Sequence, residues 1–400
     1  MAVKLIPLAS SLSNPAEDAR VTEEVADTLR GLKIEIIDPV KDEIEASEIA
    51  KGSNVIALMI TGGTEHLARA VLRASSSLML LYHDSLNSLP AALEAASALN
   101  VPIARYDDIE RVSAYVSASM AHEKLRKTKF TYFGQPSPWL IYSKTDDEDL
   151  KRVGLEVERV DLKEFIERAK AQQVGDDEVM STMDRREVIG PENDDFRTSL
   201  KIEGAIRQEL KRTGSTAFSI RCFDLLDPLK GTACLALSRL NDEGYTAGCE
   251  GDAPAAVSMM ILSSLSGRPS FMGNIATVKG KDVTIAHCTS PTSILSDFRY
   301  MNHFESGMGV GIAGKFEEGS KMTLLRMDRN LKLMRYGIGR VVKSEWRKDL
   351  CRTQVTLEID GDPSLMLTRP IGNHYSITPG NHEKGLQFLS RMISADLEKI

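Results

Sequence analysis

The sequence has few cysteines and lacks the short motifs of several enzyme classes. Its 400 residues include 5 cysteines, and no two of them form a Cys-x-x-Cys pair. This odd, widely spaced set argues against structural zinc and structural disulfides, so we expect a cytoplasmic protein. A Gly-x-Ser-x-Gly nucleophile elbow is also absent. Cys249 is a poor candidate nucleophile, because the adjacent Glu250 would raise the pKa of its thiol.

Long apolar runs and an excess of positive charge are missing as well. The longest apolar stretches, "VIALMI" and "SLMLLY", are strand-sized, whereas a membrane-spanning helix needs about 20 apolar residues. The net charge of −7 argues against a dedicated nucleic-acid-binding protein. We therefore expect neither a membrane nor a nucleic acid as a partner.

One stretch matches the dinucleotide-binding fingerprint but lacks the structural context that the fingerprint needs. The stretch "GVGIAG" at Gly309–Gly314 matches Gly-x-Gly-x-x-Gly, but the residues after it predict a turn and a strand. The motif needs a helix N-terminus after the glycines to receive the pyrophosphate. A nicotinamide-dependent dehydrogenase is therefore disfavoured.

What the sequence does contain is an alternation of strand and helix patterns. Composition is ordinary for a globular protein, with 42% apolar and 27% charged residues, and the length suggests two or three domains. In residues 1–127, buried strand patterns such as "NVIALMIT" alternate with amphipathic segments, which predicts an α/β domain on an open parallel sheet. The stretch "GQPSPW" marks the start of a second α/β domain over residues 128–298.

The pattern changes after about residue 300. Short strand patterns follow one another without a helix between them, in "KMTLLRM", "YGIGRVV", "TQVTLEI" and "LMLTRP". They predict an antiparallel β-rich domain over residues 299–400, closed by a helix in "EKGLQFLSRMISADLEKI". The expected fold class is α/β, with two open parallel-sheet domains followed by a C-terminal antiparallel β-rich domain.

Polar residues follow two predicted strands of the first domain, in "TGGTEH" and "HDSLNSLP". The carboxyl ends of parallel strands share one edge of a sheet, and ligands collect there. We therefore expect substrate-binding groups at that edge, namely Thr61, Gly62, Gly63, Glu65, His66 and Asn87.

Two carboxylates stand two residues apart in "TAGCEGDAPAA". Asp252 precedes Pro254 at the start of a predicted helix, so we interpret it as the helix N-cap, with proton transfer as the alternative. Glu250 lies before the cap, at the carboxyl end of a strand, where α/β sheets place functional groups. The sequence leaves two roles for Glu250, which are holding a divalent metal ion and moving a proton.

Three histidines are candidates for either a structural or a functional role. His287, in "VTIAHC", shares a strand face with apolar residues, so it is either a core histidine or a catalytic group. His303 lies beside Glu305 in "NHFESG" and is either a site residue or a surface residue. His374 lies in "GNHYSITPGNH", where no packing periodicity explains it, and this favours a functional role.

Several of these motifs together resemble the L-fucose isomerase-like family. They are "CLALSRLNDEGYTAGCEGD", "MMILSSLSGRPSFMGN", "AHC", "HFESGMGVGIAG", "CRTQ" and "GNH". In particular, the chain looks like the shorter, fucose isomerase-related prokaryotic members, and the resemblance is specific over residues 216–380. It implies two α/β domains, a β-rich C-terminal domain and a ketol isomerase that interconverts aldoses and ketoses through an ene-diol.

The resemblance also implies a bound divalent metal ion, usually Mn²⁺, with Mg²⁺ and Co²⁺ as alternatives. By motif, Glu250 matches a carboxylate that is both ligand and base, and His374 matches the histidine ligand. Asn274, in "SFMGN", stands where the family's sugar isomerases carry aspartate. An amide oxygen can coordinate a hard ion but cannot take up a proton at neutral pH. Proton transfer would then need Glu250 alone or a further group, for which the candidates are Asp252, His287 and Glu305.

A small sugar or sugar derivative is the implied substrate, with His287 and His303 as candidates for binding it or relaying protons. The resemblance further implies a homo-oligomer, a trimer or hexamer, whose sites form between subunits and include the first-domain edge. The alternative is a catalytically inactive carbohydrate-binding or regulatory protein of the same fold, which Asn274 favours.

Overall fold

The computed structural model describes residues 3–400, and the chain divides into two compact units. The first contains the chain up to Glu123 together with Lys384–Ile393. The second contains Lys124–Glu383 and Ser394–Ile400. Among residues 3–400, none of the helices combines the length and the apolar character that a membrane span requires.

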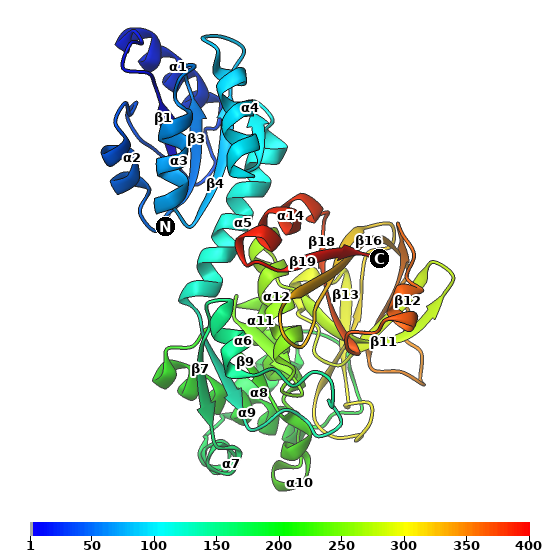
Figure 1. Cartoon of the computed structure of the whole chain (residues 1–400). Helices are drawn as coiled ribbons and strands as arrows, with labels where there is room; N and C mark the ends of the chain where they lie inside the picture. Colours follow the sequence, from blue (N-terminus) through cyan, green and yellow to red (C-terminus); the bar gives the residue numbers. More distant parts are fainter. Residues whose placement is uncertain (1–2) are drawn as a thin grey trace. The chain divides into compact units, whose positions relative to one another are not determined.

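The first unit is built on a parallel sheet with the strand order β2-β1-β3-β4-β5 (Figure 1). Central strand residues such as Val55 and Met59 are fully buried, as expected for strands covered by helices on both faces. The sheet confirms the predicted α/β fold of this part of the chain. Its elements are β1 (Val3–Leu8), α1 (Pro15–Thr28), β2 (Ile34–Ile36), α2 (Glu43–Ala50), β3 (Asn54–Met59), α3 (Glu65–Ala74), β4 (Ser77–Tyr82), α4 (Ser88–Leu99), β5 (Ile103–Arg105), α5 (Ile109–Lys127) and α14 (Glu383–Met392).

The second unit starts with another parallel sheet, of strand order β10-β9-β6-β7. Its core contains Phe133, Phe218 and Ile220 from the strands and Ile206 and Leu237 from the covering helices. The elements are β6 (Lys129–Phe133), α6 (Asp147–Arg152), β7 (Glu156–Val160), α7 (Leu162–Ala171), α8 (Asp176–Met183), α9 (Asn193–Thr213), β9 (Ala217–Ile220), α10 (Leu226–Leu229), α11 (Cys234–Asp242), β10 (Thr246–Cys249) and α12 (Ala253–Ser266). This confirms the second parallel-sheet region.

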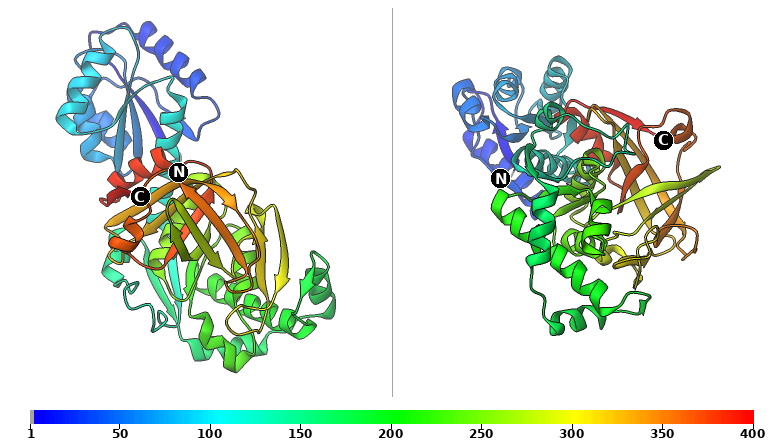
Figure 2. Two further views of the ribbon diagram at one scale, coloured as in Figure 1. Left: turned by 90° about the vertical axis from the view of Figure 1, so that its right-hand side faces the viewer. Right: turned by 90° about the horizontal axis from the view of Figure 1, so that it is seen from below.

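An antiparallel β-rich region follows, as predicted for the C-terminal part, and it closes into a barrel. Its strands are ordered β15-β18-β11-β12-β17-β16, and β16 pairs back to β15, which closes the barrel. Figure 1 labels β11, β12, β16 and β18 of this barrel, and Figure 2 gives two further views of the chain. Strands β11 and β12 precede residue 298, so the barrel takes its first strands from the range expected for the second domain. The barrel strands are β11 (Phe271–Lys279), β12 (Asp282–His287), β15 (Lys321–Met327), β16 (Leu333–Lys343), β17 (Thr353–Ile359) and β18 (His374–Pro379).

Smaller elements complete the second unit. A short sheet has the order β14-β13-β8, and α13 precedes β18. The strand predicted in "LMLTRP" is wrong, because Leu365–Thr368 form α13, with the backbone N–H groups of Leu367 and Thr368 bonded to Ser364 O. Their bounds are β8 (Val188–Ile189), β13 (Asp297–Met301), β14 (Gly311–Lys315) and α13 (Leu365–Thr368).

The predicted closing helix is shorter than expected. Helix α14 ends at Met392, and Ser394 has a φ of 54°, in the left-handed region that commonly ends helices. The residues after it form β19 (Asp396–Lys399), which pairs in parallel with β16. The sequence pattern that predicted a helix therefore continues past Met392, where the helix itself ends.

Helix α12 joins the second parallel sheet to the barrel. It packs against β9 and β10 and also against β15 and β18 of the barrel. Burial on most of its circumference accounts for its lack of a polar face. Because β10 ends at Cys249 and α12 starts at Ala253, the short turn between them lies between the sheet and the barrel.

Candidate metal centre

Glu250 occupies the turn between β10 and α12 in an unusual backbone conformation. Its φ is 60° and that of Gly251 is 74°, so two successive residues adopt left-handed conformations. A glutamate rarely adopts this conformation without structural support, and such residues concentrate at functional sites. The side chain is 9% exposed. The turn therefore holds a nearly buried carboxylate at the carboxyl end of a parallel strand.

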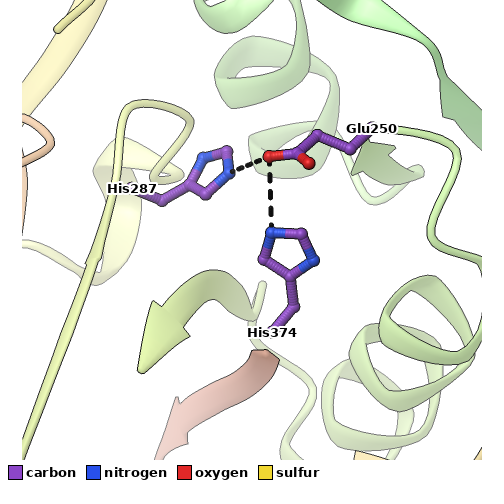
Figure 3. Close-up of side chains that lie close together, drawn as sticks. All are labelled: Glu250, His287 and His374. Atoms are coloured by element: carbon purple, nitrogen blue, oxygen red, sulfur yellow. Dashed lines mark ion pairs between the residues drawn. The ribbon is translucent and has the colours of Figure 1, made fainter. Parts of the chain in front are cut away.

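Two barrel histidines face this carboxylate (Figure 3). His374 begins β18 and is fully buried, with its Nε2 3.4 Å from Glu250 Oε1. His287 ends β12, and its Nε2 lies 3.8 Å from the same oxygen. The ligand atoms of the three residues all lie within 4.8 Å of one another. The sheet and the barrel thus contribute to a single polar cluster, which we call the Glu250 cluster.

The donor set of the Glu250 cluster fits a divalent metal ion. Bonds of about 2.1 Å place neighbouring ligand atoms about 3.0–3.5 Å apart, so the 3.4 and 3.8 Å separations from Glu250 Oε1 to the two Nε2 atoms need at most a few tenths of an ångström of adjustment. Two imidazole nitrogens and one carboxylate oxygen suit first-row divalent metals and leave coordination positions open for substrate oxygens. The cluster could therefore hold such an ion through Glu250 Oε1 and the Nε2 atoms of His287 and His374.

Neighbouring groups orient both imidazoles. His374 Nδ1 lies 3.0 Å from Asp252 Oδ2, and Thr289 Oγ1 lies 3.0 Å from His287 Nδ1. A carboxylate can only accept, so Nδ1 of His374 carries a hydrogen. Metal-binding histidines generally use their second nitrogen in this way, which fixes the tautomer that presents Nε2.

Asp252 is itself held by a buried arginine. Its Oδ1 accepts a hydrogen bond from Ala255 N, which confirms the predicted helix N-cap. Arg326 Nη1 also donates to Oδ1 and Oδ2, at 3.0 and 2.9 Å, and both side chains are fully buried. Arg326 donates further to Ser143 Oγ and to the backbone oxygen of Ile371. Asp252 therefore does more than cap α12, because it links Arg326 to His374.

The charged groups of the Glu250 cluster shift one another's pKa values. Burial alone would raise the pKa of Glu250, but His287 and His374 outweigh it and hold that pKa well below its usual range. Burial alone would lower the pKa of His374, but the hydrogen bonds to Asp252 and Glu250 raise it to about 9. Without a metal, the cluster is therefore an imidazolium held between two carboxylates. A metal ion binding at Nε2 of His374 has to displace that proton.

Asn274 lies beside the cluster, on β11 between the strands that carry the histidines. It pairs with His374 across β11 and β18. Asn373 Nδ2 donates to Asn274 Oδ1 at 2.8 Å and lies 3.5 Å from His374 Nε2. The amide oxygen expected as a ligand is thus next to the histidine but is already used by Asn373.

His303 forms a second acid–base pair in this unit. Its Nε2 lies 2.9 Å from Glu305 Oε2, and Ser306 Oγ lies 3.0 Å from its Nδ1. Burial alone would lower the pKa of His303, but Glu305 raises it. The ring also contacts Phe223, with 5.5 Å between centroids. His303 is buried rather than on the surface, and its ring nitrogens already have partners.

The residues predicted at the first-domain edge do come together within the first unit. Gly62 N donates to Leu86 O, so the loop after β3 is bonded to the loop after β4. Thr61 Oγ1 accepts from Ser10 N at 2.8 Å, and Asn87 adopts a left-handed φ of 58° before α4. Gly63, Glu65 and His66 belong to the same loop and to the start of α3. Their part in substrate binding stays a prediction.

Cys249 is not an activated thiol. Its Sγ lies 2.9 Å from Cys222 Sγ, and both side chains are buried. The contact with Cys222, burial and the charge of Glu250 raise the pKa of Cys249 well above its usual value. A cysteine nucleophile at this position is therefore disfavoured, as the sequence indicated.

Two contributors to the site are missing from the sequence-based prediction. Trp139 Nε1 donates to Glu250 Oε2 at 2.7 Å, from a loop whose prolines indicate only a domain boundary. Arg326 lies in the apolar stretch "KMTLLRM", where a buried arginine needs an acidic partner. A charged residue within an otherwise apolar strand is a sequence signal that could have identified Arg326. Nothing in "GQPSPW" points to the contact between Trp139 and Glu250.

Comparison with known proteins relates the segment around Glu250 to sugar isomerases. Residues 148–267 match the family model of the L-arabinose isomerase central domain. This segment contains Glu250 and Asp252. The chain is 27% identical over 188 residues to a sulfoquinovose isomerase of Alkalicoccus urumqiensis, covering 45% of this chain and 42% of the relative.

Two further relatives give the same result. Identity is 25% over 246 residues to a sulfoquinovose isomerase of Clostridium sp. (strain MSTE9), covering 57% of this chain and 54% of the relative. Identity is 29% over 172 residues to the L-arabinose isomerase of Thermotoga petrophila, covering 41% of this chain and 34% of the relative. The chain thus spans about half the length, or less, of these relatives. The similarity is to sugar isomerases of the arabinose isomerase type, not specifically to the L-fucose isomerases.

Proposed function

We propose that this protein is a metal-dependent ketol isomerase that interconverts the aldose and ketose forms of a small sugar or sugar derivative. The observation that carries the proposal is the Glu250 cluster, whose carboxylate lies in the segment similar to the L-arabinose isomerase central domain. The names of the relatives make L-arabinose and sulfoquinovose the first substrates to test.

In this proposal Glu250, His287 and His374 hold a divalent metal ion, with Mn²⁺ as our first choice and Mg²⁺ or Co²⁺ as alternatives. When bound, such an ion polarises the carbonyl and hydroxyl oxygens of the substrate. Asp252 and Thr289 keep the two imidazoles oriented. Glu250 and both histidines are nearly or fully buried, which limits the access of water to the groups that would hold the ion.

Glu250 is the proposed base. Its carboxylate is ionised, so an oxygen can accept the proton from C2 of the aldose and return it to C1 of the ene-diol. The strongly lowered pKa makes it a weak base in the metal-free site, and a metal ion would replace the imidazolium proton that contributes to this shift. If a second group moves the hydroxyl proton, the candidate is the His303–Glu305 pair, in which the imidazole is buried and the carboxylate is exposed, because Asn274 cannot titrate at neutral pH.

The proposal is tested by measuring bound metal and sugar conversion together. The purified protein is analysed for metal content and then incubated with Mn²⁺ and a panel that includes L-arabinose, sulfoquinovose and other pentoses and hexoses. We expect about one ion per chain and conversion of at least one sugar. Bound metal without conversion of any sugar would instead support the alternative, a catalytically inactive carbohydrate-binding or regulatory protein of this fold.

A homo-oligomer with sites formed between subunits belongs to the same proposal. We expect a trimer or hexamer by sedimentation, with Thr61–His66 and Asn87 contributing to substrate binding. Substitution of His66 by alanine should then raise the KM for the sugar without changing the metal content. A monomer with full activity would contradict this part of the proposal.

A further inference from the structure

Trp139 divides the two oxygens of the Glu250 carboxylate between two tasks. Its indole Nε1 donates to Oε2 at 2.7 Å, whereas Oε1 is the oxygen that faces His287 and His374. A carboxylate on a flexible side chain could present either oxygen or both. The indole hydrogen bond selects one orientation, with Oε1 directed into the cluster.

The loop that carries Trp139 is fixed to the backbone of the Glu250 turn. Ser137 N donates to the backbone oxygen of Glu250 at 2.9 Å. At Gly251 a Cβ would lie 2.6 Å from Pro136 Cα, so the loop and the turn approach as closely as glycine permits. The position of the indole and the left-handed conformation of Glu250 are therefore supported by the same contact.

The rest of the indole is available to a ligand. The ring packs edge-on against Phe223, with 5.0 Å between centroids and an interplanar angle of 84°. Phe223 packs in turn on His303. Even so, Trp139 is 49% exposed, which is unusual for the largest apolar side chain when it also contacts a buried carboxylate. Aromatic side chains commonly line ligand sites, and an indole combines an apolar face with a polar N–H group.

We propose that Trp139 is a positioning and specificity residue, which fixes Glu250 through its indole N–H and packs its exposed face against the C–H face of a sugar ring or chain. This assignment rests on the proposed isomerase function. It predicts two separable effects, weaker metal binding and a higher KM for the sugar. They are separable because different substitutions remove the hydrogen bond and the aromatic face. Substrates with a continuous apolar face next to the reacting carbons would be preferred over those whose hydroxyls point towards the indole.

Trp139→Phe tests the hydrogen bond, since it keeps an aromatic ring and removes the donor. We expect the dissociation constant for Mn²⁺ or Co²⁺, measured by calorimetry, to rise about tenfold, the range seen for groups that orient metal ligands. The KM for the sugar should change less than about threefold, since the aromatic face is kept. Trp139→Ala removes both functions, so its KM should rise about tenfold or more in addition to the weaker metal binding.

Tryptophan fluorescence gives a readout that does not depend on turnover. The chain has 2 tryptophans, so in a Trp346→Phe background Trp139 is the only one left. Trp346 lies elsewhere, beneath Arg299 and Lys315. We expect Co²⁺ to quench the emission of Trp139, and a polyol analogue of the sugar to shift it in the presence of Mg²⁺.

The outcomes separate this assignment from the proposed function. A parent protein that binds no metal, or binds metal but converts no sugar, contradicts the isomerase proposal itself and this assignment with it. A parent that binds metal and converts a sugar, with Trp139→Phe and Trp139→Ala unchanged in metal affinity and KM, overturns the role of Trp139 alone. Circular dichroism of both variants confirms that the comparison is between folded proteins.

Discussion

Asp252 and His374 form a buried hydrogen-bonded pair, with 3.0 Å between Asp252 Oδ2 and His374 Nδ1. Arg326 donates to both oxygens of Asp252 from a fully buried position. The pair therefore sets the tautomer of His374 and directs Nε2 towards Glu250. Because Asp252 also caps α12, the same carboxylate connects the stability of the fold to the geometry of the candidate metal centre.

Substitution of Asp252 by asparagine should be strongly destabilising. Asparagine can still cap a helix, but the variant leaves the Arg326 guanidinium buried without its counter-charge. We expect a loss of about 3–5 kcal/mol in the free energy of unfolding and about tenfold weaker metal binding. Urea unfolding and calorimetry measure the two effects.

Asp161→Asn is the matched control for this substitution. Asp161 caps α7 through the backbone N–H groups of Lys163 and Glu164 and is exposed. Its replacement should cost about 1 kcal/mol or less. If the two variants lose the same stability, Asp252 is only a cap and its link to Arg326 is unimportant.

A side chain at position 372 should disturb the buried arginine. Gly372 has a φ of 119°, and a Cβ there would lie 2.6 Å from Arg326 Nη2. We expect Gly372→Ala to cost about 1–3 kcal/mol in unfolding free energy through backbone strain alone. Gly175→Ala is the control, since a Cβ at Gly175 would have no neighbour within 4 Å and its φ is not positive. Equal stabilities in urea would show that Arg326 is not tightly enclosed.

The metal-free protein should lose stability as the pH rises through about 9. The pKa of His374 is raised to about 9 in the folded protein by Asp252 and Glu250, from an ordinary value near 6.5. A raised folded-state pKa gives stability that is fully present below about 6.5 and is lost as the pH passes the folded value. The difference in unfolding free energy between the parent and His374→Gln, measured in a chelator, should therefore shrink between about pH 6 and about pH 10. A difference independent of pH would mean that His374 is neutral in the metal-free cluster.

The role of Asn274 can be tested by restoring the carboxylate. Asn274→Asp keeps an acceptor for Asn373 Nδ2 and adds a charge next to His374. If Asn274 contributes a ligand, the variant should bind Mn²⁺ about tenfold or more tightly, and Asn274→Ala should bind it more weakly. Calorimetry with both variants decides the question, because unchanged affinity in both would remove Asn274 from the ligand set.

The sequence predicts the fold class and the carboxylate of the site because both depend on local patterns. The strand-to-helix turn identifies Glu250, the proline after the cap identifies Asp252, and the lack of packing periodicity singles out His374. His287 is ambiguous in the sequence, since its strand alternation is the same for a core residue and for a ligand. The C-terminal helix is predicted too long because pairing with β16, a tertiary contact, decides where the strand begins.

The remaining contacts could not be predicted because they join distant parts of the chain. Arg326 and Asp252 are 74 residues apart, and Trp139 and Glu250 are 111 apart. No local periodicity records such pairs. The strand order of the barrel, which places β12 and β18 on either side of β11, likewise depends on pairing between strands that are far apart in the sequence.

The central claim is that Glu250 is both a metal ligand and the base of a sugar isomerase. The most direct test is solvent deuterium incorporation at C1 and C2 of a converted sugar in D₂O with Mn²⁺, followed by NMR for the parent, Glu250→Gln and Glu305→Gln. We predict incorporation with the parent, none with Glu250→Gln, and slower but detectable incorporation with Glu305→Gln, because a group that moves a hydroxyl proton does not itself remove the proton from C2. Exchange at the parental rate in a folded Glu250→Gln protein would contradict the account.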